Sequence, residues 1–109
     1  MNTLNNGAIP FLPNDVAVEV SSVITKEGAV PLAIGDLPVA IQGLIYFIKS
    51  FERVAAEAAV TGDYKTALLT MTINPLVPGD KVAHAILDEM MEAQKDYLPQ
   101  FYKSGVLQK

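Results

Sequence analysis

One long apolar segment, between Asp36 and Gly62, constrains the fold of this chain more than any other feature. Its aliphatic, aromatic and alanine residues recur at spacings of three and four, which is the pattern of one buried face of an α-helix. That face comprises Ile41, Leu44, Ile45, Ile48, Phe51, Ala55 and Ala58. Asp36 can cap the free amides of the first turn, Pro38 is tolerated there, and Gly62 suits a left-handed residue after the helix. We therefore predict a helix over residues 37–60, and because apolar residues also lie outside that face, we expect it to be covered on two sides.

The residues before this helix predict a small antiparallel hairpin. The valines within residues 16–20 alternate with smaller or polar residues, which places them on one face of a strand. Lys26-Glu27-Gly28 can form a turn, with the glycine at positive φ. Apolar residues alternate again over residues 30–34, where Pro31 cannot donate a ladder hydrogen bond and therefore indicates an edge strand.

Two further helices are predicted after Gly62. Asp63 can cap a short helix that Asn74-Pro75 ends, because the residue before proline avoids the helical region. Gly79-Asp80 begins a last helix, which we expect to end at Pro99. The fold class is therefore α+β: a small antiparallel hairpin or sheet followed by a three-helix cluster.

Composition narrows the classes of function. A chain of 109 residues predicts a single domain. Half of the residues are hydrophobic and the mean hydropathy is +0.29, which predicts an exposed apolar patch for a partner, although a generous alanine-rich core would give the same values. The net charge of −4, with scattered basic residues, argues against nucleic acid as a partner. No apolar run is long enough for a membrane span, and the absence of cysteine fits a cytoplasmic location.

Two groups of polar residues are candidates for a binding site. Asp80 and Asp88 stand four residues before and after the single histidine, His84, so the three can line one helix face and hold zinc or manganese; a solvated helix face explains the same spacing and is favoured. Asn5-Asn6-Gly7 offers amides that can hydrogen-bond a sugar hydroxyl and a glycine that lets backbone approach a ligand. An ordinary turn explains that tripeptide equally, and on the residues alone it is favoured.

Several segments resemble, in order, the C-terminal region of the NAD-dependent glycoside hydrolases of family four, most closely the 6-phospho-beta-glucosidases. The segments are Asn5-Asn6-Gly7 with Leu12-Pro13 and Val18-Glu19-Val20, then Gly35-Asp36-Leu37-Pro38, Glu57-Ala58-Ala59 with Gly62-Asp63, Asn74-Pro75-Leu76-Val77, and Tyr97-Leu98-Pro99-Gln100-Phe101. Each is weak alone, but their order and spacing make the resemblance specific over residues 5–101.

The resemblance implies an architecture like that of lactate and malate dehydrogenases, with a Rossmann domain followed by an α+β domain. It implies hydrolysis of 6-phospho-glucosides by oxidation and elimination, in which NAD oxidises the sugar and manganese, held by a cysteine and a histidine, polarises its oxygens. This chain has no cysteine and no glycine-rich loop, and His84 does not match the family's metal histidine.

The resemblance therefore implies that residues 1–109 are a single partial domain, the substrate-cleft and oligomerisation portion of a larger enzyme, inert alone. It implies no catalytic, cofactor or metal residue here; NAD and manganese belong to the full-length enzyme, and Asn5, Asn6 and Gly7 are possible residues of the substrate-cleft wall. The implied partners are the missing Rossmann domain, further copies in a homo-oligomer, and a phosphorylated disaccharide, in the cytoplasm. The alternative hypothesis is a standalone helical protein-interaction module.

Overall fold

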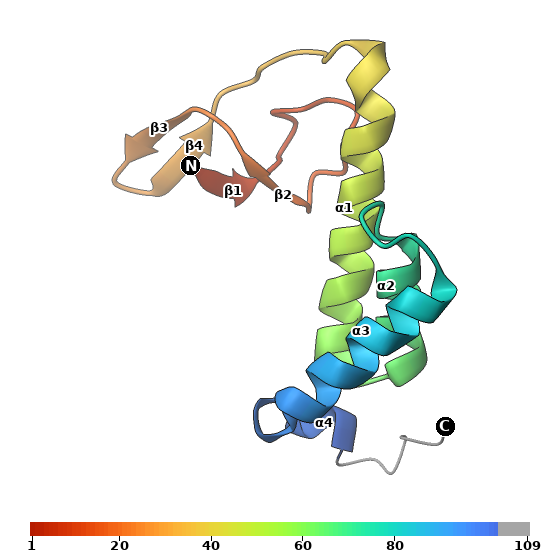
Figure 1. The fold of residues 1–109 in the computed structure, drawn as a ribbon. Helices are drawn as coiled ribbons and strands as arrows, with labels where there is room; N and C mark the ends of the chain where they lie inside the picture. The colour runs from red at the N-terminus through yellow and green to blue at the C-terminus, as the bar shows by residue number, and fades with distance from the viewer. Residues whose placement is uncertain (103–109) are drawn as a thin grey trace. The chain divides into compact units, whose positions relative to one another are not determined.

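The chain divides into two compact units, Met1–Phe47 and Ile48–Lys109. The computed structural model describes residues 1–102, and Figure 1 shows two small β-ribbons in the first unit, followed by helices from residue 39 onward. This α+β content confirms the predicted fold class, while the organisation of residues 1–109 as one partial domain stays a prediction.

The first unit contains two antiparallel ribbons of two strands each (Figure 1). The strands are β1 (Asn2–Leu4), β2 (Ala17–Glu19), β3 (Ser22–Thr25) and β4 (Gly28–Pro31). β1 pairs with β2, and β3 pairs with β4 in a register that sets Val23 opposite Val30. Gly28 has a φ of 118°, so the predicted turn and its glycine are confirmed.

The predicted pairing of strands, however, is wrong. Only two residues separate Thr25 from Gly28, so the turn pairs the segment directly before it, β3, with β4. The earlier segment of valines pairs instead with β1, at the N-terminus, which the sequence pattern did not reveal. The valines of residues 16–20 are buried as predicted, whereas Val30, Leu32 and Ile34 are about half exposed.

The core of the first unit is built by the loop between β1 and β2 together with Val18 of β2 and the valines directly before and after that strand. Its buried residues are Ala8, Ile9, Leu12, Val16, Val18 and Val20, and Phe11, Leu37 and Ile45 lie against them. The loop is therefore part of the core rather than a surface connection.

The helices follow the predicted order, with one difference near the end. They are α1 (Val39–Thr61), α2 (Tyr64–Ile73), α3 (Asp80–Ala93), the 3₁₀ helix η1 (Lys95–Tyr97) and α4 (Pro99–Tyr102). Gly62 has a φ of 71°, and a carboxylate oxygen of Asp63 accepts a hydrogen bond of 2.7 Å from the amide of Thr66. Both predicted helix boundaries are thus confirmed.

Three expectations about these helices are wrong. The last long helix ends at Ala93 rather than at Pro99. Pro99 is instead the first residue of the short helix α4, where a backbone N–H would have no partner within the helix, so proline is tolerated. Of the predicted α1 face only Ala58 is buried, and Leu44 is 60% exposed, so α1 is only partly covered in this chain. The predicted start of α1 lies two residues early, and the side chain of Gln42 donates to the carbonyl of Leu37 there.

The core of the second unit joins α1, α2, α3 and α4. Its buried residues are Ala58, Ala67, Leu87, Met91 and Phe101, and Tyr64, Leu68, Met71, Leu98 and Tyr102 lie against them. Gln100 reaches from α4 to donate to the carbonyl of Ala59 at 2.9 Å, and the Tyr102 hydroxyl donates to that of Met91 at 2.8 Å. The residues of α4 therefore hold it against α1 and α3.

Candidate functional site

Asn5 begins the loop between β1 and β2 and organises it from the inside. Its side chain is fully buried, with 0% exposure. The amide nitrogen Nδ2 donates to the carbonyls of Ile9, Leu12 and Pro13 at 3.0, 3.0 and 3.1 Å. The oxygen Oδ1 accepts from the amide of Ile9 at 2.8 Å. All polar atoms of the side chain are therefore engaged within the loop, which is how a buried amide avoids the free-energy cost of an unmet hydrogen bond.

Asn6 and Gly7, the two residues after Asn5, differ from it because both are exposed. Asn6 and Gly7 have φ values of 42° and 83°, and they turn the chain out of β1 into the loop. The amide of Asn6 donates to the carbonyl of Asn14, across the loop, at 3.1 Å. A role of Asn5, Asn6 and Gly7 in a substrate-cleft wall stays a prediction, in which Asn5 would act by positioning the loop rather than by touching a ligand.

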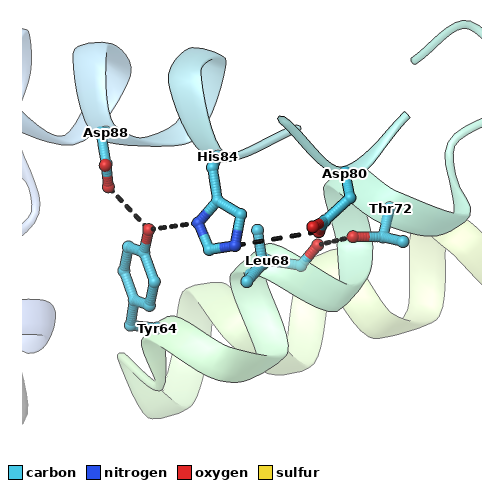
Figure 2. A network of polar contacts seen from close by, with 6 residues as sticks. All are labelled: Tyr64, Leu68, Thr72, Asp80, His84 and Asp88. Atoms are coloured by element: carbon cyan, nitrogen blue, oxygen red, sulfur yellow. Dashed lines mark hydrogen bonds and ion pairs between the residues drawn. The ribbon is translucent and has the colours of Figure 1, made fainter. Parts of the chain in front are cut away.

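A row of polar side chains links α2 to α3, as Figure 2 shows. The hydroxyl of Tyr64 donates to the Asp88 carboxylate at 2.6 Å, and it lies 3.5 Å from Nδ1 of His84. On the other side of the ring, Nε2 of His84 lies 3.8 Å from the carboxylate of Asp80. Burial raises the pKa of Tyr64 to about 12, helped by the hydrogen bond to Asp88 and by the negative charge of that carboxylate.

This row contains Asp80, His84 and Asp88, the three residues for which metal binding was the alternative to a solvated helix face. His84 and Asp88 are linked through the hydroxyl of Tyr64 rather than through a shared site. Asp80 and Asp88 contact different partners at the two ends of the row. Within residues 1–102, no group of three His, Cys, Asp or Glu side chains is placed to hold a metal ion. Tyr64 was not among the predicted site residues, and its position directly after the cap Asp63 is its only signal in the sequence.

An open apolar groove lies within the second unit, with a volume of about 210 Å³. Small alanines of α1 and α2 and larger residues of α2, α3 and the C-terminal segment line it. The lining residues are Ala55, Ala58, Ala59, Ala67, Thr70, Met71, Leu87, Met90, Met91, Gln94, Leu98 and Phe101. None of these side chains is an acid, a base or a charged group, so the groove can bind apolar groups. Met90, one of the lining residues, is 43% exposed.

Residues 1–102 contain no helix with both the length and the apolar character that a transmembrane segment requires.

Comparison with known proteins identifies close relatives. The chain is 70% identical, over 102 residues, to a probable 6-phospho-beta-glucosidase of Bacillus subtilis (strain 168), a match that covers 94% of this chain and 23% of that protein. A crystal structure of a 6-phospho-alpha-glucosidase from gut microorganisms, in complex with NAD and glucose-6-phosphate, matches with a TM-score of 0.83 at 36% identity, over 92% of this chain and 24% of that one.

The 6-phospho-beta glucosidase from Thermotoga maritima, with NAD and glucose-6-phosphate, matches with a TM-score of 0.81 at 31% identity. That match covers 89% of this chain and 24% of that one. The chain therefore spans about a quarter of the length of the relatives it matches.

The resemblance inferred from the ordered segments is confirmed at the level of the family. The model of the family 4 glycosyl hydrolase C-terminal domain matches residues 1–77, more than half of this chain. The same fold in the solved relatives agrees with that match. The chain belongs to the family of family 4 glycosyl hydrolase C-terminal domains.

Proposed function

We propose that this chain is the C-terminal substrate-cleft and oligomerisation portion of a 6-phospho-beta-glucosidase that requires NAD and manganese. The observation that carries this proposal is the 70% identity to the probable 6-phospho-beta-glucosidase of Bacillus subtilis, of which the match covers 23%. A Thermotoga maritima relative has been solved with manganese, NAD+ and glucose-6-phosphate. The substrate would accordingly be a phosphorylated disaccharide, hydrolysed in the cytoplasm.

The residues of this chain do not by themselves fit either cofactor. The sequence has no cysteine and no glycine-rich dinucleotide loop, and residues 1–102 hold no trio of metal-ligating side chains. The chain would instead form part of the wall of the substrate cleft, where the loop held by the hydrogen bonds of Asn5 would present Asn6 and Gly7 to the substrate. A Rossmann domain elsewhere in the enzyme would bind NAD. Isolated from that remainder, the chain would be inert.

A homo-oligomer is part of this proposal. Exposed apolar side chains on α1, including Val39 at 84% and Leu44 at 60% exposure, would be covered by other parts of the enzyme or by another subunit. Sedimentation of the full-length enzyme would test this, and a monomer at micromolar concentration would contradict it.

A chimera tests the proposed activity. The segment of the Bacillus subtilis relative that aligns with this chain is replaced by residues 1–109, and hydrolysis of a chromogenic 6-phospho-beta-glucoside is measured with NAD and manganese. We expect the chimera to turn over the substrate, and neither the isolated chain nor the truncated relative to do so. The alpha-linked substrate serves as the control for linkage. A folded, NAD-binding chimera without activity, or NAD-dependent turnover by the isolated chain, would contradict the proposal.

A second candidate, a standalone helical interaction module, is favoured by the apolar groove of the second unit. It requires a protein of 11.7 kDa in cells, whereas the enzyme hypothesis requires a protein about four times as long, the size of the relatives. Immunoblotting with an antibody against this chain separates the two, since a larger band alone would exclude the module.

A further inference from the structure

The ribbon formed by β3 and β4, residues 22–31, carries apolar side chains on both of its faces. Val23 stands opposite Val30, and Ile24 stands opposite Ala29. Successive residues of a strand point to opposite faces, so the two valines share one face and Ile24 lies on the other. Val23 and Val30 are each 50% exposed and Ile24 is 66% exposed. Both faces of this ribbon therefore expose large apolar side chains to solvent.

An antiparallel ribbon with one face in water alternates apolar and polar residues. The paired strands of this ribbon, its body, do not alternate apolar and polar residues in this way. Its charged residues, Lys26 and Glu27, both lie in the turn that forms its tip, 3.5 Å apart and with side chains that are 90% and 69% exposed. Two-stranded ribbons are marginally stable alone and need packing against further structure. The pattern is that of a ribbon whose body is covered on both faces and whose tip remains in water.

We infer that, in the longer enzyme, the polypeptide preceding this chain covers both faces of the β3–β4 ribbon with an apolar, uncharged surface. This inference rests on the proposed function. The ribbon lies within residues 1–77, which match the family model, and the relatives supply about three quarters of their length beyond the matched segment. A similar fold occurs in a solved relative of which this chain covers 24%, with a TM-score of 0.83.

A second copy of this chain is a poorer occupant for geometric reasons. In a two-fold dimer the same surface patch of each subunit meets its counterpart. Such a contact would cover the face of Val23 and Val30, or the face of Ile24, but it would leave the other face in water. Cover from within the same polypeptide can wrap both faces.

Cysteine labelling tests the inference directly, because the chain has no cysteine of its own. Val23→Cys reports on one face, Ile24→Cys on the other, and Lys26→Cys at the solvated tip is the matched control. Iodoacetamide modification of the peptide that contains each position is followed by mass spectrometry, in the isolated chain and in the chimera described above. In the isolated chain we expect all three thiols to react at similar rates. In the chimera, Val23→Cys and Ile24→Cys should react at least tenfold more slowly, while Lys26→Cys is unchanged.

The outcomes separate this inference from the proposed function. A chimera that hydrolyses substrate but labels at position 23 or 24 as fast as at 26 overturns the inference and leaves the function standing. Slow labelling at both positions in an inactive chimera supports the inference and counts against the function. Protection already present in the isolated chain, together with a dimeric mass, would show that a second copy covers the ribbon and would overturn the inference. If the fused chimera does not fold, the same labelling is read on the full-length Bacillus subtilis relative, with cysteine placed at the positions aligned with 23, 24 and 26 and with the same criterion.

Discussion

Replacing Asn5 by aspartate should open the loop between β1 and β2. Asn5→Asp keeps the shape of the side chain and the oxygen that accepts from the amide of Ile9, so it creates no cavity. It removes the Nδ2 donor, which serves the carbonyls of Ile9, Leu12 and Pro13, and places a carboxylate oxygen against those carbonyls. The carbonyls of Ile9 and Pro13 keep backbone donors, the amides of Leu12 and Val16, so the buried carbonyl left unpaired is that of Leu12, at a cost of about 1–3 kcal/mol. The carboxylate oxygen, which has no donor facing it there, adds to this loss.

A loss of a few kcal/mol is a large fraction of the stability of a small domain, about 5–15 kcal/mol. Hydrogen–deuterium exchange of the amides of Asn6 and Leu12, which donate to carbonyls of the loop, measures the free energy of its opening. We expect their protection to fall by at least tenfold in Asn5→Asp at neutral pH, since a factor of ten corresponds to about 1.4 kcal/mol. Asn14→Asp, at an exposed position in the same loop, adds the same charge and is the control.

The pH dependence of Asn5→Asp adds a second check. A buried carboxyl has a raised pKa, because burial disfavours its charged form. The protonated form restores one donor, so the loop should be most stable below the ordinary aspartate pKa of about 3.9 and should lose stability, relative to the wild-type chain, as the pH rises through the raised value. Equal protection in Asn5→Asp and Asn14→Asp at neutral pH would refute the reasoning that Asn5 clamps the loop.

Two further changes test the second unit. Gly62→Ala should destabilise it for two reasons: Gly62 has a φ of 71°, and a Cβ added to it would overlap the backbone of Gln100. The unfavourable backbone conformation alone costs roughly 1–3 kcal/mol, so we expect a larger loss than that. A urea midpoint within error of the wild-type value would contradict this. Tyr64→Phe should abolish the tyrosine absorbance change near pH 12 and flatten the fall in stability between about pH 10 and 12, where the unfolded chain has lost the Tyr64 proton and the folded chain retains it. An unchanged ultraviolet titration of Tyr64→Phe would show that another tyrosine carries the raised pKa.

Sequence reasoning succeeded where the deciding residues lie next to the feature they decide. Gly62 and Asp63 end one helix and begin the next through their own backbone and side chain, and both positions were predicted. The burial of the valines in residues 16–20 follows from their alternation. In each case the physical cause spans only a few residues, so the pattern contains it.

Features that depend on distant partners could not be predicted. β1 is three residues long and pairs with a segment more than ten residues away, so no local pattern marks it. The end of α3 at Ala93 has no glycine or proline beside it, and contacts of Gln100 and Tyr102 with α1 and α3 hold α4 in place after the break. Asn5 could not be told from an ordinary turn residue, because its role depends on three carbonyls that only the folded loop brings together.

The misjudged burial of α1 has a physical meaning of its own. Ile41 and Leu44 satisfy the helical spacing of a core face, yet they are 42% and 60% exposed in this chain. Ala58, on the same predicted face, is buried. Helical periodicity reflects what the complete molecule buries, whereas exposure reflects only the residues present. Since this chain spans about a quarter of its relatives, apolar residues that obey the periodicity but remain exposed mark the surfaces on which the rest of the enzyme, under the proposed function, is expected to lie.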